Sequence, residues 1–126
     1  MADITTVTPD ARTALLTLRD VRVQFDVPGG RLPAVNGVNL TLGRGELLAL
    51  VGESGSGKSA LAMSLVGLNR GPRTHISGQV HFDGQDLVAA SEKQLRKVRG
   101  SGVAVVFQDS LAALNPLQRV GVQVAR

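Results

Sequence analysis

The chain has 126 residues, enough for one small domain, and a hydrophobic fraction of 43%, which is ordinary for a globular protein. It has no cysteine, which excludes disulfides and thiolate metal sites, and with three Phe and no Trp or Tyr it must build its core from aliphatic side chains. The formal charge is +4, but aromatic residues do not interleave with the basic cluster Lys93, Arg96, Lys97 and Arg99, so we expect a solvated helix face there and no nucleic-acid surface.

The N-terminal residues do not read as a folded element. Residues 1–14 are mostly polar and without periodicity, and we expect a disordered leader followed by one domain over residues 15–126. No basic stretch precedes an apolar one at the N-terminus, and no apolar run approaches the roughly 20 residues needed to span a bilayer. We therefore expect neither a signal peptide nor a transmembrane segment.

An antiparallel piece is predicted first. Residues 15–25 alternate like a strand, but the apolar parity switches at residues 19–20, which predicts a bulge there. Turn-forming residues occupy 26–30, and a second alternating segment covers 38–42.

A glycine-rich motif follows a short apolar run. Residues 46–51 are predicted to form a buried strand, residues 52–59 read GESGSGKS and match G-x-x-x-x-G-K-[ST], and residues 60–68 have helical periodicity. Glycines let successive backbone N–H groups point inward around an anion, and a helix N-terminus adds its dipole. Lys58 can reach β- and γ-phosphates, and the Ser59 hydroxyl can bind Mg²⁺. A flexible linker would not lie between an apolar strand and an amphipathic helix, so we predict a phosphate-binding loop.

The rest of the chain predicts a parallel element. After a stop at residues 69–72, residues 77–82 are predicted to form an edge strand and 91–99 a short helix opened by a capping box. Residues 103–107 form a continuous apolar run, typical of a strand buried on both faces of a parallel sheet. With residues 46–51 this predicts a βαβ unit with an insertion, and hence an α/β fold.

Gln108 follows this second run directly. The carboxyl ends of parallel strands meet at one edge of a sheet, so we expect Gln108 to lie beside residues 52–59. There its amide can bind Mg²⁺ or hold a water near the γ-phosphate, whereas a glutamine that merely caps a strand end is the alternative.

These motifs, in this order, resemble the ATP-binding subunits of ABC transporters, and most closely the oligopeptide, dipeptide and nickel importers. Residues 50–59 resemble the Walker A segment of that branch, 78–87 its edge hairpin, 91–100 (SEKQLRKVRG) its short helix, 105–109 (VVFQD) its Q-loop and 114–116 the LNP that follows. The resemblance covers residues 15–126 and implies a P-loop NTPase core with an antiparallel β subdomain, truncated after the Q-loop.

The resemblance implies roles for individual residues. Lys58 and Gln108 would be the catalytic positions, Ser59 and Gln108 the Mg²⁺ ligands, and Phe25 the ring that stacks on adenine, although an ordinary edge-strand aromatic is the alternative for Phe25. The residues that would bind ATP are Phe25, Gly52, Glu53, Ser54, Gly55, Ser56, Gly57, Lys58, Ser59 and Ala60. Ser110 stands where the branch usually has proline.

The resemblance also implies partners and a location. These are membrane-spanning transporter subunits, a second nucleotide-binding subunit, a solute-binding protein indirectly, and the cytoplasmic face of the cell membrane. Three features of the family do not occur in the sequence: the signature motif, a second buried strand that ends in Asp-Glu, and the switch histidine. We therefore expect ATP and Mg²⁺ binding without hydrolysis by this chain alone. Without the remaining strands, we expect marginal stability.

Two other classes of function are alternatives. A GTPase would need an N-K-x-D base-reading motif and a small-molecule kinase an arginine-rich lid, and neither occurs. A non-catalytic nucleotide-binding remnant is the other alternative.

Overall fold

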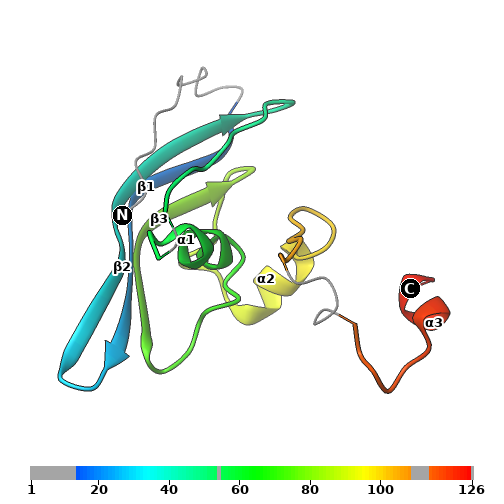
Figure 1. Ribbon diagram of the computed structural model, residues 1–126. Coiled ribbons are helices and arrows are strands. Elements are labelled where there is room, and N and C mark those ends of the chain that lie inside the picture. The colour runs from blue at the N-terminus through cyan, green and yellow to red at the C-terminus, as the bar shows by residue number, and fades with distance from the viewer. Residues whose placement is uncertain (1–13, 54, 109–113, 126) are drawn as a thin grey trace.

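The computed structural model describes residues 14–53, 55–108 and 114–125. Its elements in chain order are β1 (Ala14–Val27), β2 (Gly30–Gly43), α1 (Lys58–Leu65), β3 (Thr74–Phe82), β4 (Gln85–Asp86), α2 (Glu92–Val98) and α3 (Val120–Val124). The four strands form one antiparallel sheet in the order β2-β1-β3-β4, and α1 packs on one face of it (Figure 1). The expected leader falls on residues outside the described ranges, apart from Ala14, which is the first residue of β1.

The two long strands pair as their apolar patterns predict, including the irregularity. Leu18 lies opposite Leu40 and Val21 opposite Val38, and the register shifts between these two pairs. Asp20 has a φ of 47°, and the same shift recurs in the pairing of β1 with β3. The bulge predicted at residues 19–20 is therefore confirmed, as is the turn that joins β1 to β2.

Gly78 on β3 allows the sheet to close around this bulge. Its φ is 91°, and a Cβ at this position would lie 2.3 Å from the carbonyl oxygen of Asp20. No side chain fits at that distance, so the partner strand needs a glycine at this point.

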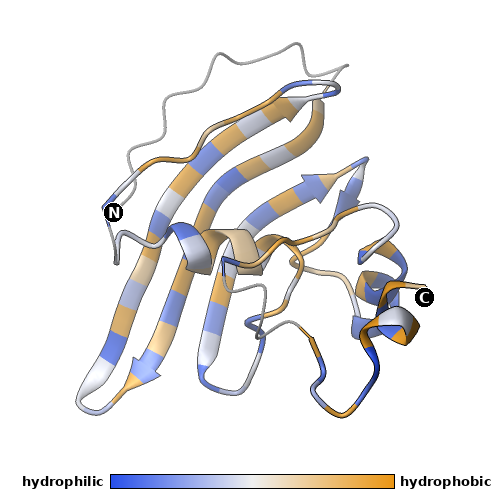
Figure 2. Ribbon diagram, turned by 45° about the vertical axis from the view of Figure 1, so that its right-hand side comes forward, coloured by the Kyte–Doolittle hydropathy of each residue, from blue (hydrophilic) through white to orange (hydrophobic). Residues whose placement is uncertain are grey.

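The core lies between α1, the α2 region and one face of the sheet. Alternating apolar and polar residues band the strands in Figure 2, as expected for a sheet that is buried on one face. The buried side chains that form the core are Leu18, Val21, Val23, Val35, Val38, Leu40, Leu61, Val80, Leu87, Ala90 and Leu95. The core is aliphatic, as the scarcity of aromatic residues requires.

Helices α1 and α2 begin within two residues of the positions that the sequence predicts. Ser91 caps α2 with a complete capping box, since its hydroxyl accepts from the Gln94 N–H and the Gln94 side chain accepts from the Ser91 N–H. Helix α1 ends at Leu65, earlier than expected, because Gly67 takes a φ of 68° and terminates it. Leu68, predicted to be on the apolar face of the helix, lies beyond it and is exposed.

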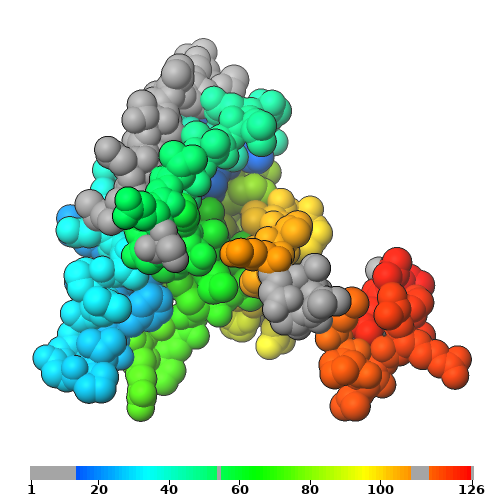
Figure 3. Space-filling view, in the orientation of Figure 1, coloured from blue at the N-terminus to red at the C-terminus, as the bar shows by residue number. Residues whose placement is uncertain are grey.

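The prediction of a parallel sheet is wrong, because neither of the two segments expected to form it is a strand in the structure. Residues 46–51 have no regular structure, and residues 103–107 contribute only one isolated bridge, between Arg99 and Val103. Leu47 is 96% exposed and Val106 is 95% exposed. Both segments are visible at the surface in Figure 3. The described residues thus contain no βαβ unit, because a parallel strand needs neighbouring strands to hydrogen-bond along its edges and helices to cover both its faces.

Candidate phosphate-binding site

The glycine-rich loop takes the backbone conformations that its glycines allow. Gly55 and Gly57 have φ values of 81° and 97°, and the Ser56 N–H donates to the Glu53 carbonyl at 3.1 Å. A Cβ on Gly57 would lie 2.2 Å from the Ala34 carbonyl oxygen of β2, so the loop rests directly on the sheet backbone. Gly57 is therefore required both by its conformation and by its packing.

Helix α1 presents a free N-terminus at the end of this loop. Gly57 is its N-cap residue and supplies no side-chain hydrogen bond to the first turn. The first N–H groups of an α-helix have no partner within the helix, and together with the helix dipole they favour an anion. Ser59 and Ala60 belong to this first turn.

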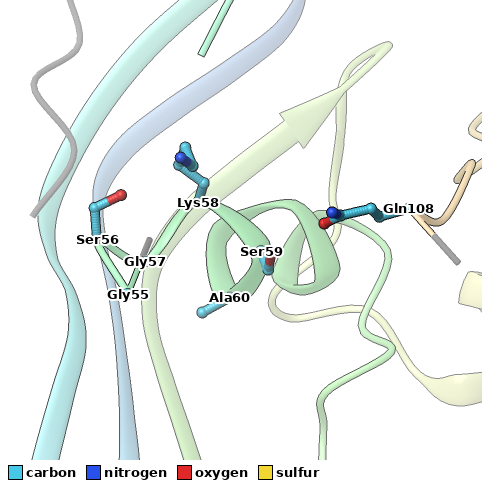
Figure 4. A pocket seen from close by; sticks show the side chains of 7 residues that line it. All are labelled: Gly55, Ser56, Gly57, Lys58, Ser59, Ala60 and Gln108. Carbon is cyan, nitrogen blue, oxygen red and sulfur yellow. The ribbon is translucent and has the colours of Figure 1, made fainter. Parts of the chain in front are cut away.

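A cavity of about 500 Å³ opens at this helix end. Its lining among the described residues is Gly55, Ser56, Gly57, Lys58, Ser59, Ala60 and Gln108. Figure 4 shows the Gln108 amide pointing toward α1 from the side opposite the loop. The structure thus brings Gln108 to the loop, as expected, even though the strand that was to carry it does not form.

The side chains in this cavity supply the groups that a phosphate–metal site needs. The Lys58 ammonium donates to the Gly52 carbonyl within the loop, and the Ser59 hydroxyl is exposed. The Ser56 Oγ is buried and makes no hydrogen bond. A buried hydroxyl without a partner costs free energy unless a ligand or water satisfies it. The cavity is therefore lined by the Lys58 ammonium, by hydroxyl groups, by an amide and by free backbone N–H donors.

Other residues predicted to bind the ligand lie away from this cavity. Gly52 and Glu53 are exposed and do not line it, and Ser54 is outside the described residues. Phe25 lies on β1, opposite Leu32 and Thr74, half-buried against the edge of the core. Its role remains a prediction. Asp109 and Ser110, also part of the resemblance, fall outside the described ranges.

Two arginines, for which the sequence predicts no structural role, bind backbone carbonyls near the other end of α1. Arg70 donates to the carbonyls of Val88 and Ala90, each at 2.8 Å, and to that of Leu87. Arg99 donates to the carbonyls of Val66 at 2.8 Å and Gly67 at 3.1 Å. Arg99 is therefore turned inward, and the expectation of a solvated face holds only for Lys93, Arg96 and Lys97.

Arg99 also sets the main electrostatic feature of this region. Its guanidinium donates to the Glu92 carboxylate at 2.6 Å. This hydrogen bond is the main reason that the pKa of Glu92 lies below its ordinary value, and the charges of Arg99, Arg96 and Arg70 act in the same direction. The carboxylate is half-exposed, so solvent limits the effect.

Two further properties concern metals and membranes. Within the described ranges, His, Asp and Glu side chains do not gather in groups of three that could hold a metal ion. The helices found there are too short or too polar to cross a membrane.

The loop, the helix N-terminus and the lysine–serine pair define the class of P-loop nucleotide-binding proteins. Comparison with known proteins gives the family: residues 35–123 match the ABC transporter family, and the chain belongs to it. Domains of this family bind ATP.

Curated relatives agree with this assignment. The chain is 42% identical to the oligopeptide transport ATP-binding protein OppD of Bacillus subtilis over 113 residues, which are 89% of this chain and 32% of that protein. It is 40% identical to OppD of Salmonella typhimurium over 124 residues (98% of the chain, 37% of the relative). It is 42% identical to the oligopeptide transport ATP-binding protein AmiE of Streptococcus pneumoniae over 114 residues (90% and 32%). The chain spans about a third of the length of these relatives.

Proposed function

We propose that this chain provides the ATP–Mg²⁺ binding elements of a transporter subunit that powers peptide uptake. The observation that carries the proposal is the cavity that α1 and its glycine loop form on one side and Gln108 on the other. The names of the relatives, which are oligopeptide transport ATP-binding proteins, support the substrate class.

The residues of the cavity fit a nucleotide polyphosphate. The first-turn N–H groups of α1 and the loop backbone would hold the phosphate oxygens, and the Ser56 hydroxyl, which has no partner, would gain one. Lys58 would exchange its internal acceptor, the Gly52 carbonyl, for the β- and γ-phosphates. This exchange replaces a neutral acceptor with a charged one, which strengthens the hydrogen bond.

Mg²⁺ fits the oxygen donors of the same cavity. Ser59 and Gln108 line it and carry a hydroxyl and an amide oxygen, the hard ligands that Mg²⁺ prefers beside phosphate oxygens. When bound, the ion would neutralise charge on the phosphates. We propose Phe25 as the residue that stacks on adenine through its ring face.

We assign nucleotide binding to the described residues. The partners proposed are membrane-spanning transporter subunits, a second nucleotide-binding subunit and, indirectly, a solute-binding protein. The proposed location is the cytoplasmic face of the cell membrane, where such a subunit would be held by its partners.

A titration with a fluorescent ATP analogue and Mg²⁺ tests the proposal. Lys58→Ala should weaken binding by about 10–100-fold, since it removes a charged hydrogen-bond donor worth roughly 1.5–3 kcal/mol. Lys93→Ala is the matched control, because Lys93 is an exposed lysine on α2 outside the cavity and its loss should change affinity by less than about twofold. Absence of binding by the parent chain, or equal affinities for both variants, would contradict the proposal.

A further inference from the structure

The two ends of α1 contact different parts of the molecule. Its N-terminus faces the phosphate cavity, while the carbonyls just beyond its C-terminus, at Val66 and Gly67, accept hydrogen bonds from Arg99. A cation at a helix C-terminus is favoured by the helix dipole, and charged hydrogen bonds to carbonyls are stronger than neutral ones. The Arg99 side chain is 26% exposed, so these bonds are partly shielded from water.

Arg99 also begins the segment that leads to Gln108. The Gly102 and Val103 N–H groups donate to the Val98 carbonyl at 2.8 and 2.9 Å, and the Gly100 N–H donates to the Val103 carbonyl at 2.7 Å. These bonds fold residues 98–103 into a tight loop, with Arg99 near its start. Gln108 is reached only five residues later along an extended segment.

That extended segment has little else to hold it. Residues 104–107 pair with no strand of the described part of the chain, and Phe107 is 44% exposed. A second cavity, of about 280 Å³, lies between this segment and the end of α1 and is lined by Val66, Leu68, Arg99, Val103, Val105 and Phe107, among others. Within the described residues, the Arg99 bonds are the hydrogen bonds that join α1 and the turn after it to the segment from Arg99 to Gln108.

We infer that Arg99 is a positioning residue for the phosphate site, which fixes Gln108 relative to the N-terminus of α1. The inference rests on the proposed function for its ligand. Arg99 does not line the phosphate cavity; it acts through α1, a helix of eight residues that spans about 12 Å. With Arg99 bound to the far end of this helix, the loop at residues 98–103 and the segment after it start from a fixed point. Gln108 then faces Ser59 across the cavity in one arrangement.

The inference specifies why arginine is needed. One guanidinium donates through separate nitrogens to Val66, Gly67 and the Glu92 carboxylate, and a lysine ammonium cannot match this planar geometry. Arg99→Met keeps much of the apolar stem and removes the donors. Arg96→Met is the matched control, because Arg96 is an exposed arginine on the last turn of the same helix, α2.

A distance measurement tests the positioning without any nucleotide. The chain has no cysteine, so Ala62→Cys and Val106→Cys, both at exposed positions, take spin labels specifically on α1 and just before Gln108. Electron paramagnetic resonance should give a narrow distance distribution in the doubly labelled parent and with Arg96→Met, and a distribution at least twice as broad with Arg99→Met. An unchanged distribution with Arg99→Met overturns the inference. Arg99→Lys, which keeps the charge, is the second variant if Arg99→Met fails to fold by circular dichroism, and it should also broaden the distribution.

A binding measurement separates positioning from a general loss of structure. Affinity for the fluorescent ATP analogue without Mg²⁺ should be the same within about twofold for the parent and Arg99→Met. The gain in affinity on adding Mg²⁺ should fall about tenfold, as is typical when the residue that orients a metal ligand is removed. Gln108→Ala should reduce the gain similarly, and the double variant no further.

The outcomes distinguish the two proposals. If the effects of Arg99→Met and Gln108→Ala on the Mg²⁺-dependent gain are additive, or if Arg99→Met weakens binding equally with and without Mg²⁺, the inference fails while the proposed function stands. If the parent binds no nucleotide but Arg99→Met still broadens the label distances, the proposed function fails and the positioning of residue 108 by Arg99 is supported.

Discussion

The antiparallel sheet and the two apolar segments at 46–51 and 103–107 are built from similar residues but are buried to different extents, with Leu48 and Leu50 packing only in part against the core. In the sheet, the exposed fraction of Leu18, Val23 and Val80 is 2% or less. In the segments, Leu47, Val51 and Val106 are more than two-thirds exposed, at 96%, 69% and 95%. A hairpin strand finds its partner across a short turn, whereas a parallel strand depends on neighbours that are distant in the chain. Burial of apolar residues thus follows from the availability of a partner strand as much as from hydrophobicity.

The largest expected effect contrasts one residue from each region. Leu18→Ala should lower the free energy of unfolding by about 2–5 kcal/mol, because it removes a fully buried side chain and leaves a cavity. Val106→Ala, at a position 95% exposed, should change it by no more than about 0.5 kcal/mol. Urea unfolding followed by far-ultraviolet circular dichroism measures both, since the chain has no tryptophan or tyrosine to report by fluorescence. Similar losses for the two variants would mean that residues 103–107 are buried in solution.

An intermediate effect tests the irregularity that gives the sheet its register. Gly78→Ala should cost about 1–3 kcal/mol, because Gly78 has a φ of 91° and its new Cβ would meet the Asp20 carbonyl oxygen at 2.3 Å. Gly71→Ala is the control, as it has open space and no positive φ. The same urea experiment compares them. A neutral Gly78→Ala would show that β1 and β3 do not meet closely at the bulge.

The smallest effect concerns helix α2, which precedes the second apolar segment and whose Glu92 binds Arg99. The pKa of Glu92 is lowered in the folded chain, so its ionised form contributes stability above the ordinary pKa of glutamate, and this contribution is lost as the pH falls through the lowered value. The thermal midpoint of the parent should therefore exceed that of Glu92→Gln slightly at pH 7, and the difference should shrink as the pH falls below the ordinary pKa of glutamate and through the lowered value. Thermal scans from pH 7 to pH 3 measure it. A difference of the same size at every pH in this range would assign the effect to packing.

Local features of the fold could be predicted from the sequence because their causes are local. The parity switch at residues 19–20, the turn after Val27 and the capping box at Ser91 each depend on neighbouring residues. The approach of Gln108 to the glycine loop was also predicted, and the cavity lining confirms it. The expected cause, a parallel strand over residues 103–107, is wrong, because these residues form no strand in the structure.

The rest depended on distant contacts. A continuous apolar run such as residues 103–107 is a strand only where other strands flank it, which composition does not reveal. Arg99 lies in a run of basic residues, and nothing in its pattern distinguishes it from its exposed neighbours Arg96 and Lys97. Only the position of the carbonyls at the end of α1 does so.

The contact between Gly57 and the Ala34 carbonyl ties the glycine loop to a fixed point on β2, the strand that also pairs with Phe25. The phosphate loop rests at Ala34, and Phe25 is paired with Leu32, two residues along the same strand, a rise of about 7 Å. Strand register therefore sets the interval between the loop and the Phe25 ring. Extra residues in the turn at 28–29 would leave that interval intact, whereas a single residue inserted between Leu32 and Ala34 would lengthen it and turn Leu32 to the opposite face of the sheet.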